Sequence, residues 1–293
     1  MKVQIPNYDI SHFDEYRQDG LLVSRFGSYA RRHQHLHQAH RHSFYHLVFF
    51  TRASGSHTID FVNYPLSDGV VYFMAPGQVH SWSFDGEPEG FIVNFASDYY
   101  SRFLQNPAYL ENFGIFDPGS GKQVVETDEA LRNKLTVLFE QMLDESKDTQ
   151  VFHADLVRLL LLEICIWVSR AAGAAVENNP SYGQRLLKNF RQLIDAHFRE
   201  QKFPHQYAAQ LYITPNHLNA LCNELTGKSA GTLIRERCLL EAKRMLVNAD
   251  LSIAGIAAEL HFADQSYFGR FFKRHEGVSP EKFRKHLQQQ THG

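Results

Sequence analysis

Histidines are concentrated near the amino terminus of this sequence, and their spacing could bring several imidazoles together. The stretch 31–42, RRHQHLHQAHRH, contains five of the 17 histidines, and its end begins the pattern His40-x-His42-x-x-x-His46. A second pattern, Gly69…Pro76-Gly77-x-x-His80, adds another histidine later in the chain. Imidazoles gathered in this way could hydrogen-bond a ligand or one another, or they could bind a divalent metal ion.

The spacing of two along this stretch predicts that one face of a β-strand carries most of these side chains. Alternate residues of a strand point the same way. If that face is the interior of a barrel, the pocket is apolar with a cluster of imidazoles, which suits a mid-sized organic ligand bearing one or two polar groups. We predict a small-molecule effector site and no bound metal or cofactor, with the site formed by His40, His42, Phe44, His46, Val48, Phe50, His80 and Trp82. The alternating His33, His35 and His37 favour a solvated face instead.

In the last third of the chain, polar side chains form the outer face of an expected helix that begins at Thr214. Pro215 suits the first helical position, where a backbone N–H has no partner to lose. The positions expected to face inward are Leu218, Leu221, Cys222 and Leu225. The outward positions are Asn216, His217, Asn219, Ala220 and Asn223. Asparagine can make paired hydrogen bonds to adenine in the major groove, and an alanine methyl can contact a thymine methyl.

A second expected helix, capped by Asp264, has a more basic outer face. Its outward residues are Gln265, Ser266, Tyr267, Arg270, Lys273 and Arg274, whereas Phe268, Phe271 and Phe272 are expected in the core. Arg270 is the best candidate for a base or phosphate contact. Lys273 and Arg274 are expected to bind phosphates, contacts that set affinity rather than sequence preference.

These two helices belong to an internal repeat. Ala208, Ala209 and Leu211 precede Ala257, Ala258 and Leu260 by 49 residues, whereas Leu218, Cys222, Gly227 and Ser229 precede Phe268, Phe272, Gly277 and Ser279 by 50. The single extra residue falls in the turn, where an insertion does not rotate a helical face. Each copy reads as two short helices joined by a tight turn, the arrangement of a helix-turn-helix DNA reader. A long helix over Ala230–Val247 is expected between the copies.

The segment from Arg185 to Arg284 resembles the DNA-binding domain of the AraC/XylS family of bacterial transcription regulators. The resemblance is carried by AAQL…TPNHLNALCNELTGKS and by IAAELHFADQSYFGRFFKRHEGVSPEKFR. It implies two recognition helices that enter successive major-groove segments on one face of double-stranded DNA. It also implies a homodimer, RNA polymerase as a partner, and activation of transcription.

The N-terminal motifs are similar to the two motifs of the cupin β-barrel, the usual sensor domain of this family. A cupin normally carries Glu where this chain has His46, and Asn where it has Phe84. The resemblance leaves an alternative open, in which His40, His42, His46 and His80 would be the ligands of a metal-dependent cupin enzyme fused to a DNA-binding module. We favour a regulator that is not an enzyme, because no nucleophile–base pair, phosphate-binding loop or HExxH motif is present.

The elements that would position these residues can be read from the hydrophobic pattern. Short apolar runs punctuated by Gly and Pro predict a sandwich or barrel with strands at Leu21–Phe26, Phe44–Thr51, Thr58–Val62, Val70–Met74, His80–Phe84 and Gly90–Phe95. Helical spacing follows at Asp128–Asp144 and Val151–Ser169, and the short loop between them predicts an antiparallel pair. These helices within 127–170 either simply cover the barrel or also form the homodimer face.

Composition is consistent with this organisation. The chain has 293 residues, 43% of them hydrophobic and 21% charged. Residues 181–293 hold 16 Lys and Arg against 10 Asp and Glu, and the preceding residues hold 14 against 22, so a basic segment follows an acidic one. The three cysteines lie in apolar stripes, which favours core packing. No signal peptide or membrane-spanning run is recognised, so a cytoplasmic protein is expected.

The sequence therefore predicts a two-domain α+β protein. A cupin-like β-barrel with an antiparallel helix pair, at 1–172, would sense a ligand and dimerise. A linker at 173–183 would lead to an all-α domain with two helix-turn-helix motifs at 184–293. The expected function is sequence-specific DNA binding under the control of a small-molecule effector.

Overall fold

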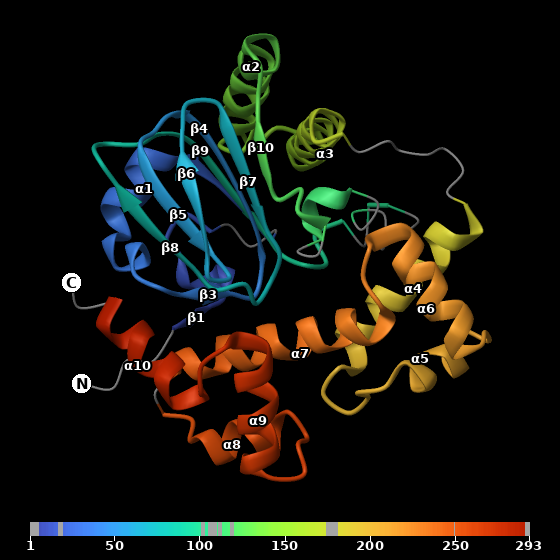
Figure 1. Cartoon of the computed structure of the whole chain (residues 1–293). Helices are drawn as coiled ribbons and strands as arrows, with labels where there is room; N and C mark the ends of the chain where they lie inside the picture. Colours follow the sequence, from blue (N-terminus) through green and yellow to red (C-terminus); the bar gives the residue numbers. More distant parts are fainter. Residues whose placement is uncertain are drawn as a thin grey trace. The chain divides into compact units, whose positions relative to one another are not determined.

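The computed structural model describes residues 6–290, except 17–19, 101–102, 105–109, 111–112, 118–119, 174–180 and 249. The described residues form two compact units, one up to residue 173 and one from residue 181 onward (Figure 1). Most of the predicted linker, residues 174–180, lies outside the described residues. Its last part is helical, because α4 begins at Tyr182 with Ser181 as its N-cap.

The N-terminal unit is built on a five-stranded antiparallel sheet with the order β10-β7-β4-β9-β2. Its strands are β2 (Leu21–Arg25), β4 (Tyr45–Arg52), β7 (Val70–Met74), β9 (Glu89–Phe95) and β10 (Val124–Glu126). A second sheet has the order β6-β5-β8, from β5 (Gly55–Ile59), β6 (Val62–Leu66) and β8 (His80–Phe84). A short pair, β1 (Asn7–Tyr8) with β3 (Arg41–His42), leads to a single bridge between His40 and His80. The predicted sheet-rich architecture is therefore confirmed.

Strand β4 separates two cores because its side chains alternate. Leu47 and Phe49 belong to the core cluster that continues into helices α2 (Glu129–Glu145) and α3 (His153–Ala171). Val48 and Phe50 belong to the other cluster, which contains residues of both sheets and of α1 (Phe26–Arg32). The predicted alternation is confirmed, and the predicted helix pair packs against the sheet as an antiparallel hairpin (Figure 1).

Two local predictions in this unit were wrong: the end of the first strand, and the strand at Thr58–Val62, which a turn after Ile59 interrupts. Phe26 starts helix α1 rather than ending a strand, and β6 was not predicted at all. The turn between β5 and β6 is made by Asp60 and Phe61, both with positive φ (45° and 72°). Hairpin turns of this kind usually contain Asn-Gly or Gly-Gly, and this turn lacks both, so its sequence carries no signal for it.

The segment expected to be a solvated histidine face also differs. Gln34–His37 forms a 3₁₀ turn, and His33 before it is buried, with its Nε2 3.0 Å from Glu15 Oε2. The carboxylate of Glu15, 18 residues away, is a polar partner that offsets the desolvation cost of burying this imidazole. The spacing of nearby residues does not predict such a partner.

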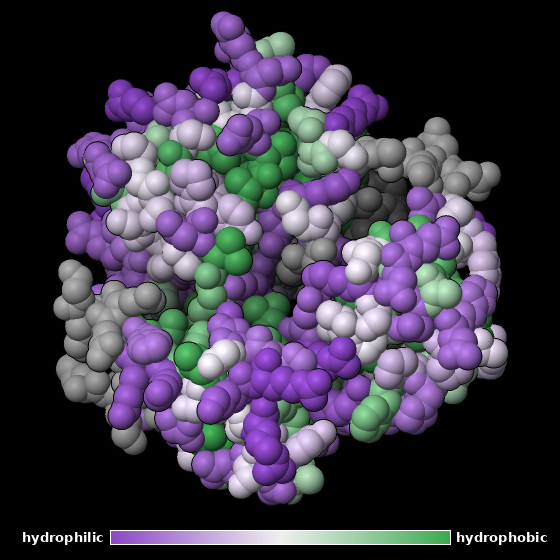
Figure 2. Space-filling model, viewed as in Figure 1, coloured by the Kyte–Doolittle hydropathy of each residue, from purple (hydrophilic) through white to green (hydrophobic). Residues whose placement is uncertain are grey.

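The C-terminal unit is all helical. It contains α4 (Tyr182–His197), α5 (Pro204–Gln210), α6 (Pro215–Thr226), α7 (Ala230–Val247), α8 (Ile253–Glu259), α9 (Gln265–Glu276) and α10 (Pro280–Gln290). Helix α7 has the predicted bounds and buries the predicted stripe of Ile234, Cys238, Ala242 and Met245. Side chains on the faces of α8 and α9 visible in Figure 2 are mainly hydrophilic. No helix among the described residues combines the length and apolarity needed to cross a bilayer.

The two copies of the repeat have matching geometry. The turn residues Tyr212 and His261, 49 positions apart, both adopt a left-handed conformation, with φ of 56° and 53°. Each following helix ends at a glycine with positive φ, Gly227 or Gly277. Ala263 is the extra residue of the second turn, so the insertion lies outside both helices, as predicted.

Candidate DNA interface and ligand cavities

Helix α6 is fixed by its cap and by its inner face. Thr214 Oγ1 accepts a hydrogen bond from the backbone N–H of His217 at 3.2 Å, and Pro215 occupies the first turn. Leu218, Leu221 and Cys222 are buried, whereas Leu225, expected to face inward, is 39% exposed. The predicted outward residues Asn216, His217, Ala220 and Asn223 are exposed together.

Asn219 has a different position from its predicted neighbours. It is half-buried, and its Oδ1 accepts a hydrogen bond from the backbone N–H of Ala230 at 3.1 Å. Ala230 is the first residue of α7, where backbone N–H groups have no partner within the helix. The side-chain oxygen of Asn219 therefore ties α6 to the start of α7, and we assign it a structural role.

Helix α9 is capped and packed in the same way as α6, but its exposed surface differs. Asp264 Oδ1 accepts from the backbone N–H of Tyr267 at 2.7 Å, and Phe268 and Phe272 are fully buried. Phe271, expected in the core, is only half-buried and packs on Phe262 and His275 at the edge of the core. All the predicted outward residues are exposed: Gln265, Ser266, Tyr267, Arg270, Lys273 and Arg274.

The two exposed faces differ in charge. On α9, the side chains of Arg270, Lys273 and Arg274 form no ion pair with the described residues, and the Arg270 guanidinium lies 5.9 Å from the Tyr267 ring. The outer face of α6 carries Glu224 but no Lys or Arg. Three unpaired cations suit a polyanion, whereas the amides of α6 suit directional hydrogen bonding.

Packed aromatic side chains support both copies of the repeat, and an ion pair between Glu276 and Lys243 of α7, at 2.9 Å, also holds α9. Tyr207 of α5 contacts Phe190 of α4 with ring centroids 5.5 Å apart, beneath the first copy. Phe272 of α9 contacts Phe283 of α10 at 5.4 Å, beneath the second. Arg284 of α10 donates to the carbonyl oxygen of Leu251 at 2.7 Å. These contacts give each exposed helix a rigid support.

In the N-terminal unit, five buried imidazoles lie together between the two sheets. The ring centroids of His40 and His80 are 4.0 Å apart, and His42 lies 5.0 Å from both His46 and His80. His57, which the sequence analysis missed, stacks on Trp82 at 3.3 Å. The signal for His57 was weak, because it lies in a neighbouring strand outside both histidine patterns.

Hydrogen bonds to oxygen acceptors indicate which ring nitrogen carries the proton in three of these histidines. The Nδ1 of His40 donates to the carbonyl oxygen of Gln38 and that of His42 to the carbonyl oxygen of Phe44, both at 2.9 Å. The Nδ1 of His46 lies 2.7 Å from Asn94 Oδ1. Among the described residues, the Nε2 atoms of His42, His46 and His80 have no partner. These nitrogens therefore point lone pairs or unused N–H groups into a closed interior.

Burial keeps these imidazoles neutral. Desolvation lowers the pKa of His40 to about 4 and that of His46 to about 3. The pKa values of His42, His57 and His80 are also lowered, first by burial and then by neighbouring imidazoles. At neutral pH the cluster is a set of uncharged hydrogen-bonding groups.

The predicted effector residues come together, but little space remains between them. We call this space the interior cavity; it measures about 10 Å³ and is lined by His40, His42, Phe44, His46, His80 and Trp82, among others. Val48 and Phe50 belong to the surrounding core instead. A cavity of this size holds at most about one water molecule. The described residues include no group of three or more His, Cys, Asp or Glu side chains arranged to hold a metal ion.

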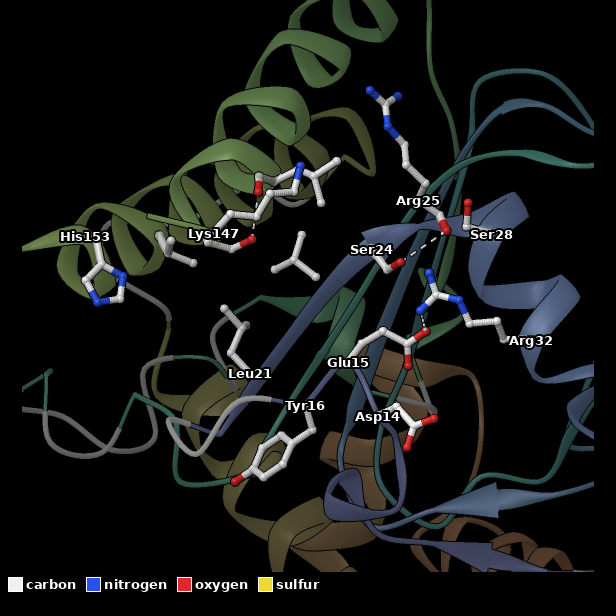
Figure 3. Close-up of a pocket in the computed structure, with 14 residues that line it drawn as sticks. Asp14, Glu15, Tyr16, Leu21, Ser24, Arg25, Ser28, Arg32, Lys147 and His153 are labelled. Atoms are coloured by element: carbon white, nitrogen blue, oxygen red, sulfur yellow. Dashed lines mark hydrogen bonds and ion pairs between the residues drawn. The ribbon is translucent and has the colours of Figure 1, made fainter. Parts of the chain in front are cut away.

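A second cavity, which we call the outer cavity, measures about 660 Å³ and lies against the other face of the sheet edge (Figure 3). Strand β2 and helix α1 form one side, and the end of α2 with the start of α3 forms the other. In Figure 3, Lys147, in the turn after α2, and His153, at the start of α3, lie on the opposite side of the cavity from Ser24, Ser28 and Arg32. Sequence analysis missed this cavity, because its charged residues come from distant segments and each one alone reads as a solvated side chain.

Comparison with known families matches both units. The AraC-like ligand-binding domain matches residues 22–162, and a helix-turn-helix domain matches residues 207–286. Among solved structures, the C-terminal domain of AraT from Geobacillus stearothermophilus is 27% identical, covering 36% of this chain and 88% of that one, with a TM-score of 0.34. ToxT from Vibrio cholerae is 12% identical, covering 90% and 97%, with a TM-score of 0.43.

Curated relatives align over most of the chain. The arabinose operon regulatory protein of Escherichia coli is 24% identical over 225 residues, covering 74% of this chain and 72% of the relative. The transcriptional activator RhaR of Yersinia pseudotuberculosis is 22% identical over 249 residues, covering 84% and 83%. With its duplicated helix-turn-helix unit behind an AraC-like ligand-binding domain, the chain belongs to the AraC family of transcriptional regulators.

Proposed function

We propose that the chain is a ligand-responsive transcription activator that binds DNA as a homodimer and acts with RNA polymerase. The observation that carries the proposal is the duplicated pair of packed helices, in which α6 and α9 each present a polar outer face on a rigid support. Paired recognition helices of this kind insert into the major groove. The relative RhaR is named as an activator, which supports the direction of regulation.

The two helices would contribute unequally to DNA binding. On α9, Arg270 would contact a base or phosphate, and Lys273 and Arg274 would bind phosphates, with Gln265, Ser266 and Tyr267 beside them. On α6, Asn216, His217 and Asn223 would read base edges, and Ala220 would contact a thymine methyl. We therefore expect α9 to supply most of the affinity and α6 much of the discrimination between sequences.

Self-association would use the outward side of the helix pair. Val137 of α2 and Leu156 and Leu159 of α3 are 56%, 48% and 50% exposed, although their helices bury apolar side chains on the opposite side. Apolar residues exposed on neighbouring turns are costly unless a partner covers them. A second copy of the chain, packed helix pair to helix pair, would cover both sets at once.

The effector would enter the barrel interior at His40, His42, Phe44, His46, His80 and Trp82. Because the interior cavity is nearly full, we expect these side chains to rearrange when a ligand enters. The unpartnered ring nitrogens favour a neutral ligand rich in hydroxyl groups, which can both donate and accept hydrogen bonds. Such a ligand would shift the protein between states that differ in DNA binding, in proportion to its preference for one state.

Binding to the DNA upstream of the chain's own gene tests the proposal. We expect the full chain to bind this duplex more tightly than a scrambled duplex of equal length and composition, in an electrophoretic mobility assay at about 150 mM salt. Arg270→Ala should weaken the specific complex at least about fivefold, because an arginine contact is worth about 1–3 kcal/mol. Arg52→Ala, the same change in the N-terminal unit, is the control. Equal affinity for both duplexes, together with indifference to Arg270→Ala, would contradict the proposal.

A further inference from the structure

We propose that Asn219 is a positioning residue whose hydrogen bond to α7 sets the spacing at which α6 and α9 meet the DNA. In this role Asn219 does not touch the DNA itself. The inference rests on the proposed function and names the residue that fixes the geometry of the paired recognition helices. Its basis is a difference between the two copies of the repeat in how each exposed helix is joined to the helix that follows it.

In the first copy, the join is a hydrogen bond from the start of α7. Ala230 is fully buried, and a backbone N–H at the first position of a helix has no acceptor within that helix. The N-cap Ser229 does not serve it, because its Oγ accepts from the N–H of Thr232 at 3.2 Å. Instead, Asn219 Oδ1 accepts from the N–H of Ala230 at 3.1 Å. Removing this acceptor would leave a buried donor unsatisfied, which costs more than the net contribution of one hydrogen bond.

The second copy lacks both partners of this bond. The positions 50 residues later are Gly269 and Pro280, so neither the side-chain acceptor nor the N–H donor exists there. Proline suits the first position of a helix because it has no N–H to satisfy. A Cβ atom at Gly269 would meet none of the described residues within 4 Å, so space does not exclude an asparagine there. The asparagine is therefore present where the next helix begins with a buried N–H and absent where it does not.

Asn219 is also poorly placed to read a base. It is half-buried, whereas Asn216 and Asn223 on the same helix are exposed. The paired hydrogen bonds that an asparagine makes to adenine require its side-chain oxygen. In Asn219 that oxygen already accepts from the N–H of Ala230. The amide therefore serves the protein rather than the duplex.

Helix α7 carries this join to the second copy. Asn219 holds α6 at the first residue of α7, and Lys243, further along α7, pairs with Glu276 of α9 at 2.9 Å. Both side chains of this pair are largely buried, at 18% and 21% exposed. An α-helix rises 1.5 Å per residue, so the step of 13 residues from Ala230 to Lys243 separates the two attachments by about 20 Å. A helix attached to both recognition helices fixes the separation of their DNA contacts.

Binding to duplexes of altered spacing tests the inference. The probes are the upstream duplex and two derivatives, with one base pair added or removed between the two segments that a footprint of the unaltered chain protects. In fluorescence anisotropy with the full chain, Asn219→Ala should bind the upstream duplex at least about threefold more weakly than the unaltered chain. It should bind one of the derivatives at least about threefold more tightly, because α6 is no longer held at one separation. Asn223→Ala is the matched control, since loss of a proposed base contact should weaken binding to the upstream duplex and tighten neither derivative.

Two further variants separate positioning from stability. Asn219→Asp keeps an oxygen acceptor for the N–H of Ala230 and should retain the spacing preference of the unaltered chain. Asn219→Ala with Ala230→Pro removes the buried donor together with its acceptor. Ser229 has the extended conformation that a residue before proline needs, with φ of −70° and ψ of 154°. This double variant should recover the thermal stability lost in Asn219→Ala but not the spacing preference, because α6 remains detached from the start of α7.

The inference is overturned if Asn219→Ala tightens neither derivative, if Asn219→Asp relaxes the spacing preference as Asn219→Ala does, or if the double variant recovers that preference. Where Asn219→Ala is too unstable to assay, the double variant carries the same test. Specific binding that is weakened by Arg270→Ala, with the spacing preference unchanged in Asn219→Ala, refutes this inference alone. An unaltered chain that binds the scrambled duplex as tightly as the upstream duplex refutes the proposed function instead.

Discussion

The two units differ in whether their functional polar side chains are buried or exposed. The N-terminal unit buries five imidazoles between its sheets, where desolvation keeps them neutral, whereas the C-terminal unit exposes its cations and amides on α6 and α9. Buried groups can bind only a ligand that enters the interior, whereas exposed groups can bind a charged partner without any opening of the structure. If the effector enters the barrel interior as proposed, sensing requires these side chains to rearrange, whereas the proposed DNA contacts require only a rigid presentation of α6 and α9.

A second comparison lies within the helical unit. The two repeat copies share left-handed turns, side-chain N-caps and C-terminal glycines, but their outer faces diverge. The backbone conformation matches across the copies, whereas the side chains of Ala220 and Arg270, at equivalent positions 50 residues apart, do not. We therefore expect the duplicated architecture to make two different contacts with DNA.

The largest expected difference between the two units is in their stability at low pH. Because folding lowers the pKa of His40 to about 4 and of His46 to about 3, the unfolded chain binds protons more readily than the folded one. Stability is then full above the unfolded pKa near 6.5 and is lost as the pH falls towards 3. The loss should reach roughly 3 kcal/mol from His40 and roughly 5 kcal/mol from His46.

The pH experiment has an internal reference. Urea unfolding followed by hydrogen exchange, at pH 7 and pH 5, should show protection falling in β4 and β8 while α7 changes much less. A loss of protection that is the same in both units, or greater in α7, would contradict the assignment of the neutral cluster. A double variant, His40→Gln with His46→Gln, should reduce the pH dependence of the N-terminal unit but not abolish it, because His42, His57 and His80 remain buried.

Core truncation should compare the two repeat copies directly. Phe268 and Leu218 occupy equivalent, fully buried positions. Phe268→Ala should lower the free energy of unfolding by about 3–5 kcal/mol and Leu218→Ala by about 2–5 kcal/mol, because each leaves a cavity beneath its helix. Chemical denaturation monitored by circular dichroism measures both. A cost below about 1 kcal/mol for either change would mean that its helix is not supported as described.

Removal of positive charge from α9 should lower the salt dependence of DNA binding. Helix α6 has no Lys or Arg, so its polar residues should not affect that salt dependence. Lys273→Gln with Arg274→Gln should reduce the slope of log affinity against log salt by about two, since each lost phosphate contact lowers it by about one. Asn216→Ala with Asn223→Ala on α6 should leave that slope unchanged while reducing sequence discrimination. Filter binding from 50 to 300 mM salt distinguishes the outcomes, and equal slope changes for both pairs would remove the distinction between the helices.

The smallest effect is expected at the caps. Thr214→Ala and Asp264→Ala should each cost about 1 kcal/mol, because each leaves a backbone N–H of the first helical turn without its side-chain acceptor. Thr214→Ser and Asp264→Asn are the matched controls that retain an acceptor. Thermal unfolding measures all four, and an alanine no worse than its control would exclude a capping role.

Much of the fold follows from local signals in the sequence. Helix α7 has the bounds expected from its apolar stripe, and the offset of 49 and then 50 residues located the inserted Ala263 in a turn. The exposed residues of α6 and α9 were predictable for the same reason, since helical periodicity separates an inner face from an outer one. Leu225 and Phe271, predicted to face inward, are partly exposed. Asn219, predicted to face outward, is half-buried, because its partner, the backbone N–H of Ala230, is set by a turn of the chain.

The cavities depend on contacts that no local pattern contains. The histidine cluster was predicted as a lining, but how far Trp82 and His57 fill the space depends on the distance between two sheets. The outer cavity joins β2 to the α2–α3 hairpin, segments more than 100 residues apart. Burial of His33 likewise required Glu15, a partner outside its own segment.

The most direct test of the account is a methylation-interference and hydroxyl-radical footprint of the full chain on its upstream DNA. We predict two protected major-groove segments per protomer on one face of the duplex, about one helical turn or 34 Å apart. Arg270→Ala should erase one segment and Asn223→Ala should weaken the other. A single protected segment, two segments on opposite faces, or loss of the same segment in both variants would contradict the assignment of α6 and α9 as paired recognition helices.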